Sequence, residues 1–249
     1  MSPISRRKLI TGGVVAAAGL GGAAAATRLA ERYGLIPPDS GVVWGAGETL
    51  TYAAQRLLTT HVPARQFPRS MISKTPFMNE VAPPNAMYKT LQAEGWRLQV
   101  DGMVAHPGPF TLADLHRLPI HNQITEVACE EGWSYVAEWI GTPLHEVLNV
   151  AGLLPQARYI VYYSTEKNVW DSLDMADALH PQTLVTLGMN DGDLPLGFGG
   201  PVRLRVPRQL GYKSVKYLTR LTATDDLKKF GKGLGSSSPE FGYSWYAGI

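Results

Sequence analysis

The sequence contains little cysteine and little charge. It has one cysteine in 249 residues, which excludes an intramolecular disulfide, a zinc ribbon, a Cys-x-x-Cys redox pair and a self-attached c-type haem. Charged residues make up 18% of the chain, and 23 Lys and Arg against 21 Asp and Glu leave a net charge of +2. This balance does not supply the basic stripe typical of nucleic-acid-binding proteins, so no nucleic-acid partner is expected.

Several common catalytic motifs are also missing. The chain has no Gly-x-Ser-x-Gly nucleophile elbow, no phosphate-binding P-loop and no His-Glu-x-x-His zinc motif. Its six histidines are scattered, and none is paired with a carboxylate at a metal-ligand spacing. The glycine-dense residues 197–200 precede a proline and a strand instead of a helix, which indicates a turn and not a dinucleotide-binding loop.

The residues that are abundant favour a fold of short strands and structured loops. Hydrophobic residues make up 45% of the chain, which also holds 26 glycines and 18 prolines. Short strands and helices follow one another without a βαβ rhythm, so we predict an α+β fold with mixed sheets and short helices. The predicted strands cover residues 96–102, 125–129, 159–163, 202–206 and 217–224, and the predicted helices cover residues 52–58, 111–115 and 143–151.

The first 32 residues are typical of a targeting segment. Arg6 and Arg7 precede a Gly- and Ala-rich apolar stretch that ends in three alanines at 24–26, a pattern that predicts a twin-arginine signal and export to the periplasm. The alternative is an uncleaved signal that anchors the chain to the membrane. Residues 33–94 are interpreted as an extended lead-in that wraps the core, and residues 95–249 as the core of a single domain.

Cys129 is the first candidate functional residue. It ends a predicted strand and opens the loop Cys-Glu-Glu-Gly-Trp-Ser at residues 129–134. An exposed free thiol oxidises outside the cytoplasm, so a lone cysteine there is either buried and inert or bound to a metal. Thiolate is a soft ligand suited to a transition metal. The residues alone leave both interpretations open.

A second constellation lies at residues 200–216, where a predicted strand carries Arg203 and a glycine turn carries Ser214 and Lys216. An arginine fork, a lysine charge and turn N–H groups together suit a phosphate. The alternative is a solvated basic face between strands. If the side chain of Lys213 faces solvent only, we expect Lys213→Ala to weaken phosphate binding less than Arg203→Ala does.

In their order and spacing, these motifs resemble the sulfite oxidase family. The resemblance rests on Cys-x-Glu-Gly-Trp-Ser at Cys129, Trp-x-Gly-x-Pro-Leu at Trp139, Gly-x-Pro-x-Arg ending at Arg203, and Gly-Tyr-Lys-Ser-Val-Lys at Gly211. It is closest to bacterial twin-arginine-exported members related to the catalytic subunit of the periplasmic methionine sulfoxide reductase. The resemblance runs from about Tyr52 to the C-terminus and implies a molybdopterin-dependent oxidoreductase with a sulfite oxidase-type fold.

The resemblance also implies roles for particular residues. Cys129 matches the cysteine that binds molybdenum through its sulfur and tunes it. The residues that match the family's pterin contacts are Asn85, Tyr88 and Lys89, Ser164 (or Thr165), and Arg203 with Ser214, Val215 and Lys216. We also expect Trp133 and Tyr135 either to line the mouth of the site or to pack in the core. Arg69 either helps to bind an anionic substrate or forms a structural ion pair.

One residue departs from the family pattern. Phe198 stands five positions before Arg203, where relatives carry a polar His or Asn. This change predicts a cofactor that is bound but held less tightly.

The implied reaction moves an oxygen atom and two electrons to or from a small, possibly sulfur-containing substrate. The sequence has no haem or iron–sulfur motif to pass these electrons on, so a separate partner is required, for which the resemblance implies a membrane cytochrome b subunit. Two alternatives are a sulfite-type dehydrogenase working in the oxidative direction and a cofactor-free binding or assembly protein that keeps the fold.

Overall fold

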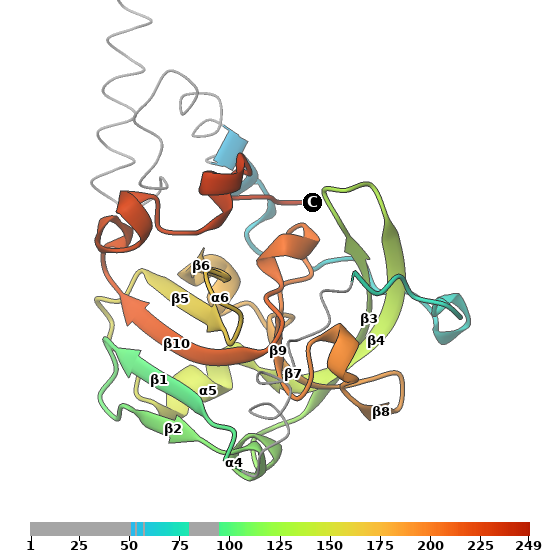
Figure 1. Ribbon diagram of the computed structural model, residues 1–249, viewed down its shortest axis with the longest axis horizontal. Helices are drawn as coiled ribbons and strands as arrows, with labels where there is room; N and C mark the ends of the chain where they lie inside the picture. Colours follow the sequence, from blue (N-terminus) through green and yellow to red (C-terminus); the bar gives the residue numbers. More distant parts are fainter. Residues whose placement is uncertain (1–50, 53, 57, 80–94) are drawn as a thin grey trace, which may run out of the picture.

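The computed structural model describes residues 51–52, 54–56, 58–79 and 95–249. Within these ranges the chain forms two five-stranded sheets joined by short helices (Figure 1). Apolar side chains from both sheets belong to one hydrophobic cluster, so the sheets share a core. The predicted α+β class with mixed sheets is confirmed.

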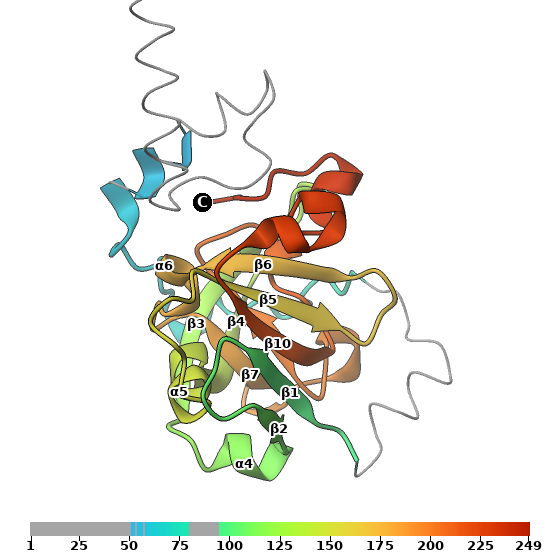
Figure 2. The ribbon, with the colours of Figure 1, turned by 90° about the vertical axis from the view of Figure 1, so that its left-hand side faces the viewer.

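The first sheet has the strand order β2-β1-β10-β5-β6 (Figure 2). β1 pairs with β10 in parallel, and the other neighbours are antiparallel. Its strands are β1 (Leu98–Gly102), β2 (Gly108–Phe110), β5 (Tyr159–Ser164), β6 (Trp170–Asp174) and β10 (Leu218–Thr224).

The second sheet has the order β3-β4-β7-β8, and β9 pairs with β7 outside that path. All its pairs are antiparallel. Its strands are β3 (His121–Ala128), β4 (Ser134–Pro143), β7 (Leu184–Met189), β8 (Gly192–Asp193) and β9 (Arg203–Arg205). β3 and β4 form a long hairpin, and the loop at its tip holds Cys129.

The named helices are short and connect the strands. The α-helices are α4 (Leu112–His116), α5 (Leu144–Val150) and α6 (Met175–Ala178). The 3-10 helices are η1 (Arg69–Met71), η2 (Leu196–Phe198), η3 (Gly211–Lys213), η4 (Leu227–Lys229), η5 (Gly231–Gly233) and η6 (Ser238–Phe241). No helix within the described part of the chain combines the length and the apolar character needed to cross a membrane.

α4 and α5 follow from local sequence. Thr111 caps α4: its hydroxyl accepts from the Asp114 N–H at 3.0 Å, and the Asp114 carboxylate accepts from the Thr111 N–H at 2.9 Å. α5 buries Leu144, Val147 and Leu148 completely. The spacing of these three residues places them on one face of the helix, which packs into the shared core.

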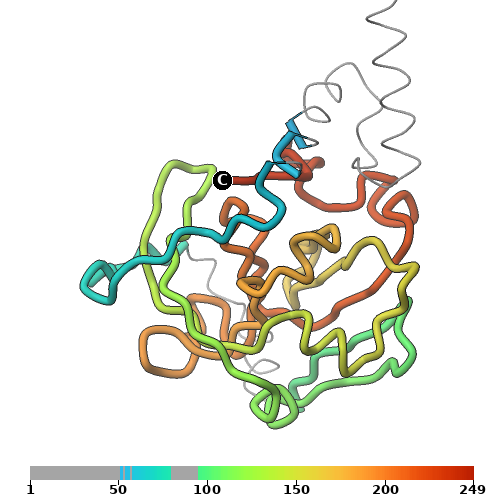
Figure 3. The backbone as a smooth tube through the Cα atoms, turned by 180° about the vertical axis from the view of Figure 1, so that it is seen from behind, coloured from blue at the N-terminus to red at the C-terminus, as the bar shows by residue number. Residues whose placement is uncertain are grey.

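Residues 66–73 lie against the second sheet. Figure 3 shows the segment of residues 58–79 crossing the face seen from behind, past the β3–β4 hairpin. The Phe67 N–H donates to the Ile124 carbonyl at 2.9 Å, and the Ser73 N–H donates to the Val136 carbonyl at 2.9 Å. The proposed signal segment lies outside the described residues, as do residues 33–50 and 80–94 of the lead-in, and the domain boundaries stay predictions.

A buried ionic cluster fastens the helical residues around position 56 to α6. Arg56 contacts Asp174 at 2.7 Å and Asp177 at 2.5 Å, and the Tyr52 hydroxyl donates to Asp174 at 2.6 Å. Arg208 contacts Asp177 at 3.2 Å from the other side. Because these side chains are almost fully buried, removing one partner would leave an uncompensated charge in the core.

The position of His180 next to this cluster predicts that the folded protein loses stability in acid. Burial, reinforced by the Arg208 cation, lowers the pKa of His180 to about 4, whereas an unfolded histidine titrates near about 6.5. The folded state therefore resists protonation, and the associated stability is present above pH ~6.5 and lost as the pH falls towards 4. In His180→Asn, the side-chain oxygen takes over the acceptor role of Nδ1 toward the Gln182 N–H.

We expect wild-type protein to lose ~2 kcal/mol more unfolding free energy than His180→Asn between pH 7 and pH 5. Urea unfolding at several pH values measures this difference. Parallel pH profiles for the two proteins would contradict the assignment.

Candidate functional site

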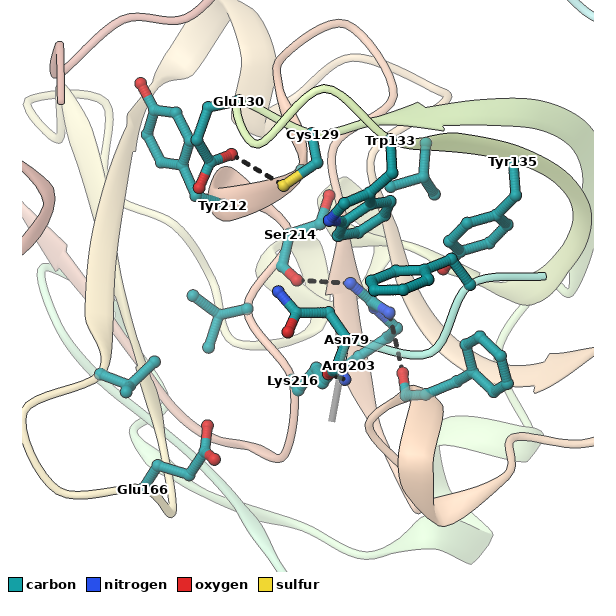
Figure 4. A pocket seen from close by; sticks show the side chains of 16 residues that line it. Asn79, Cys129, Glu130, Trp133, Tyr135, Glu166, Arg203, Tyr212, Ser214 and Lys216 are labelled. Atoms are coloured by element: carbon teal, nitrogen blue, oxygen red, sulfur yellow. Dashed lines mark hydrogen bonds between the residues drawn. The ribbon is translucent and has the colours of Figure 1, made fainter. Parts of the chain in front are cut away.

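Cys129 lies in the loop that joins β3 to β4. The Ala128–Ser134 pair closes the hairpin, and within the loop the Cys129 N–H donates to the Trp133 carbonyl at 3.0 Å. Gly132 has a φ of +91°, a conformation that residues with a side chain rarely adopt. The turn therefore places Cys129 at the tip of the hairpin, with its sulfur toward a cavity that is described below (Figure 4).

Carboxylates surround the Cys129 thiol. Its Sγ donates to Oε2 of Glu130 at 3.2 Å and lies 3.9 Å from Oε2 of Glu131. Burial is the largest influence on the pKa of Cys129, and together with the two carboxylates it raises this pKa to about 12. The thiol is therefore protonated at neutral pH.

β9 places two arginines beneath this loop. Arg203 and Arg205 are two residues apart on a strand and point to the same side, and they are 3% and 0% exposed. Arg203 donates to the carbonyls of Phe198 at 2.8 Å and Ser214 at 2.6 Å. Arg205 donates to the Ser214 hydroxyl at 3.2 Å and also to the Glu126 carbonyl.

Neither arginine is neutralised by the residues that the structure describes. No carboxylate among these residues is close enough to either guanidinium group to form an ion pair. The Nε atom of each arginine also lacks a hydrogen-bond partner among them. Both guanidinium groups lie over the ring of Trp139, 5.2 and 5.6 Å from its centre, which compensates only part of the charge. Burial accordingly lowers the pKa of Arg203, and burial with the neighbouring Arg203 lowers that of Arg205 to about 9.

The residues after η3 run beside β9. The Leu204 N–H donates to the Val215 carbonyl at 3.0 Å, and the Ser214 hydroxyl accepts from the Val206 N–H at 3.0 Å and from Arg205. Lys216 donates from Nζ to the Gly197 carbonyl at 2.7 Å and to the Asn79 carbonyl at 2.6 Å. These contacts fix a hydroxyl and an ammonium group next to Arg203.

A cavity of about 260 Å³ lies between the Cys129 loop and this basic segment. Five of the residues predicted to contact the metal or the pterin line it together: Cys129, Arg203, Ser214, Val215 and Lys216 (Figure 4). Glycine at 211 lets η3 approach the Cys129 loop closely, since a Cβ there would lie 3.3 Å from the Ala128 carbonyl oxygen, tighter than an ordinary contact.

Other predicted site residues lie elsewhere. Ser164 does not line the cavity itself, but its hydroxyl accepts from the N–H of Glu166, which does, at 3.0 Å. Arg69 is not among the lining residues; it contacts Glu138 at 2.8 Å and also pairs with Asp191. Arg69 therefore forms the structural ion pair that was the alternative to a role in binding an anionic substrate. Asn85, Tyr88 and Lys89 lie outside the described residues.

Aromatic residues form one wall of the cavity. Trp133, Tyr135 and Phe198 all line it. The Trp133 and Tyr135 rings stack with centres 6.0 Å apart, and Phe198 meets Tyr135 edge-on at 5.9 Å. Although Phe198 brings no polar side chain, its backbone carbonyl still binds Arg203. Its effect on cofactor affinity stays a prediction.

Lys213 requires a correction. The assumption that its side chain faces solvent is wrong, because Lys213 is 0% exposed. Its Nζ forms an ion pair with Asp171 and donates to the carbonyls of Ser172 at 2.9 Å and Trp245 at 2.8 Å. Lys213 therefore ties η3 to β6 and to the C-terminal segment.

The sequence analysis assigned no role to Arg205, Glu166 or Tyr212, which also contribute to the site. Arg205 lies two residues after Arg203 on the same predicted strand. This spacing places both side chains on one face of the strand and could have identified Arg205. Glu166 and Tyr212 line the cavity, but they lie in connecting segments where no periodicity marks a direction for the side chain.

Comparisons with known proteins agree with this geometry. The sequence matches the family described as "Oxidoreductase molybdopterin binding domain" over residues 85–230. It is 36% identical over 187 residues to a "Putative protein-methionine-sulfoxide reductase subunit YedZ1" from Azospira oryzae. That match covers 73% of this chain and 66% of the relative, so this chain spans just under two thirds of that relative's length.

The fold is similar to that of a solved structure, the sulfane dehydrogenase SoxCD from Paracoccus pantotrophus. The TM-score is 0.51 at 24% sequence identity, and the match covers 53% of this chain and 39% of that one. This likeness supports the predicted fold type.

The buried position of Lys213 predicts a large loss of stability on its removal. Lys213→Ala leaves the Asp171 carboxylate buried without its cation, and we expect a decrease of about 3–5 kcal/mol in the free energy of unfolding. Lys229→Ala is the matched control, since Lys229 pairs with Asp225 on the surface and should cost less than about 1 kcal/mol. Urea unfolding compares them, and equal losses would refute a structural role for Lys213.

Proposed function

The chain belongs to the family of oxidoreductase molybdopterin-binding domains, and we propose that it transfers an oxygen atom to or from a small substrate in a two-electron reaction. The observation that carries this proposal is the pair of buried guanidinium groups of Arg203, which lines the cavity, and of its neighbour Arg205; no carboxylate in the described residues neutralises them. Two buried positive charges without a carboxylate are unfavourable, and a bound anion would stabilise them. The phosphate of a molybdopterin is a suitable anion.

The residues of the cavity fit this cofactor. Cys129 supplies a sulfur ligand at one end, of the soft type that transition metals accept. Arg203, Ser214 and Lys216 supply a guanidinium, a hydroxyl and an ammonium group for the phosphate. The buried Nε of Arg203, without a partner among the described residues, is one donor available to it.

A bound molybdenum–pterin centre would supply the two-electron redox chemistry that no side chain provides. The protein's own contribution begins at Cys129, because a thiol must lose its proton to bind a metal. The Glu130 carboxylate already accepts that hydrogen at 3.2 Å and is placed to take the proton. Trp133 and Tyr135 exclude water from one side of the cavity.

Charge at the rim favours a neutral substrate over an anion. Glu130 and Glu131 flank the Cys129 sulfur, and Arg69 is occupied by Glu138 and Asp191 away from the cavity lining. Carboxylates in these positions repel sulfite and tolerate an uncharged sulfoxide. This supports a sulfoxide-type reduction over a sulfite-type oxidation, in line with the name of the Azospira relative.

The proposal extends to location and electron supply. The twin arginines at 6 and 7 support export of the folded chain to the periplasm. One cysteine is too few to ligate an iron–sulfur cluster or attach a c-type haem, so the electrons come from a separate partner. We propose a membrane cytochrome b subunit, consistent with the description of the Azospira relative as a subunit.

Replacing Cys129 tests the metal ligand. Cys129→Ser exchanges a thiol for a near-isosteric hydroxyl, a poor substitute for a soft thiolate, so we expect a folded protein without oxidoreductase activity. Activity is measured as reduction of a sulfoxide by a chemical reductant, and as sulfite oxidation with an electron acceptor. Unchanged activity of the variant, or a wild-type chain purified without molybdenum from a molybdenum-replete host, would refute the proposal.

Replacing Arg203 tests the phosphate contact. Arg203→Lys keeps the positive charge but cannot hold both carbonyls and a phosphate, and each charge-assisted bond contributes about 1.5–3 kcal/mol. We expect a molybdenum-to-protein ratio at least tenfold lower. The control is Arg220→Lys, because Arg220 lies on β10 outside the cavity lining, is half exposed and pairs with Asp101. Equal metal content in the two variants would mean that Arg203 serves the fold and not the cofactor.

A further inference from the structure

The wall of the cavity opposite Cys129 is formed by the turn between β5 and β6. Two residues of this turn, Glu166 and Val169, line the cavity, and the Glu166 carboxylate points into it (Figure 4). The Glu166 N–H donates to the Ser164 hydroxyl at 3.0 Å. This contact holds the first residues of the turn in place.

Glu166 is a half-buried carboxylate in an otherwise basic part of the cavity. Burial raises the pKa of Glu166, while the Lys216 cation and the Ser164 hydroxyl act in the opposite direction and favour the ionised form. A carboxylate that is kept partly out of water needs hydrogen-bond donors. Donors from a ligand would reach it from the cavity side.

The other acidic groups near the cavity are already engaged. Glu130 accepts the hydrogen of Cys129 at 3.2 Å, and Glu131 accepts from the Trp133 indole at 2.7 Å and from Asn79 at 3.3 Å. Among the described residues that line the cavity, Glu166 is therefore the carboxylate at the end remote from the sulfur ligand.

We propose that Glu166 binds the amino-pyrimidine edge of the pterin, and that Ser164 is a positioning residue that acts through Glu166. This inference rests on the proposed function. The 2-amino group and the neighbouring ring N–H of a pterin present two parallel donors, which a carboxylate accepts as it accepts a guanidinium fork. Cys129, Arg203 and Glu166 then bind three chemically different parts of one cofactor: its metal, its phosphate and its pterin ring.

The test compares Glu166→Gln with Glu146→Gln in protein purified with its cofactor. Gln keeps the shape of the side chain but removes the charge and replaces one acceptor oxygen with a donor. Glu146 on α5 lies outside the cavity and is about one-third exposed, so it controls for the loss of one negative charge. The readouts are pterin per protein, from the fluorescence of the oxidised pterin, and the rate of cofactor loss on dialysis.

We expect Glu166→Gln to lose pterin at least tenfold faster than wild-type protein, and Glu146→Gln to match wild type. Ser164→Ala should show a smaller change in the same direction. The melting temperature separates binding from folding: Glu166→Gln should lower that of the loaded protein and leave that of the cofactor-free protein unchanged.

The possible failures are distinguishable. Wild-type retention of pterin in Glu166→Gln, or an equal drop in melting temperature with and without cofactor, would overturn this inference and leave the proposed function standing. If wild-type protein contains no pterin when purified from a molybdenum-replete host, both the proposed function and this inference are wrong.

Discussion

The site is built around the uncompensated charge of Arg203 and Arg205. Burying two guanidinium groups without a carboxylate is unfavourable, and what offsets it within the described part of the chain is a set of carbonyl and hydroxyl acceptors and the face of Trp139. These contacts bring together β9, the hairpin of β3 and β4, and the segment after η3. The same groups that need an anion therefore also shape the cavity that would receive it.

This arrangement couples stability to ligand binding. An anion that binds the folded chain and not the unfolded one stabilises the fold in proportion to its affinity, and here it would also relieve an electrostatic strain. The buried pair of Lys213 and Asp171 supports the same segment from behind, by joining η3 to β6 and the C-terminal residues. The loop that carries Ser214 is thus held on both sides before any ligand is present.

The sequence predicted the parts of the fold and site that local pattern determines. Alternation identified β1 and β9, capping identified α4, and the lone cysteine identified the loop at the tip of the hairpin. β7 was not predicted because all six of its residues are buried, so it shows no alternation. Tertiary contacts alone decide that Lys213 is buried, that Arg69 pairs with Glu138, and that Glu166 points into the cavity.

Positive and negative groups therefore lie in different parts of the cavity, and their arrangement limits which ligands can bind in one fixed orientation. Carboxylates flank the sulfur of Cys129 at the rim, the guanidinium group of Arg203 lines the floor, and the carboxyl group of Glu166 lies on the far wall. A simple anion would meet attraction at the floor but repulsion at the rim and the far wall. A ligand with an anionic arm and a separate edge of N–H donors satisfies the floor and the far wall at once, in one orientation. A phosphorylated pterin has this distribution of groups, and a small anionic substrate such as sulfite does not.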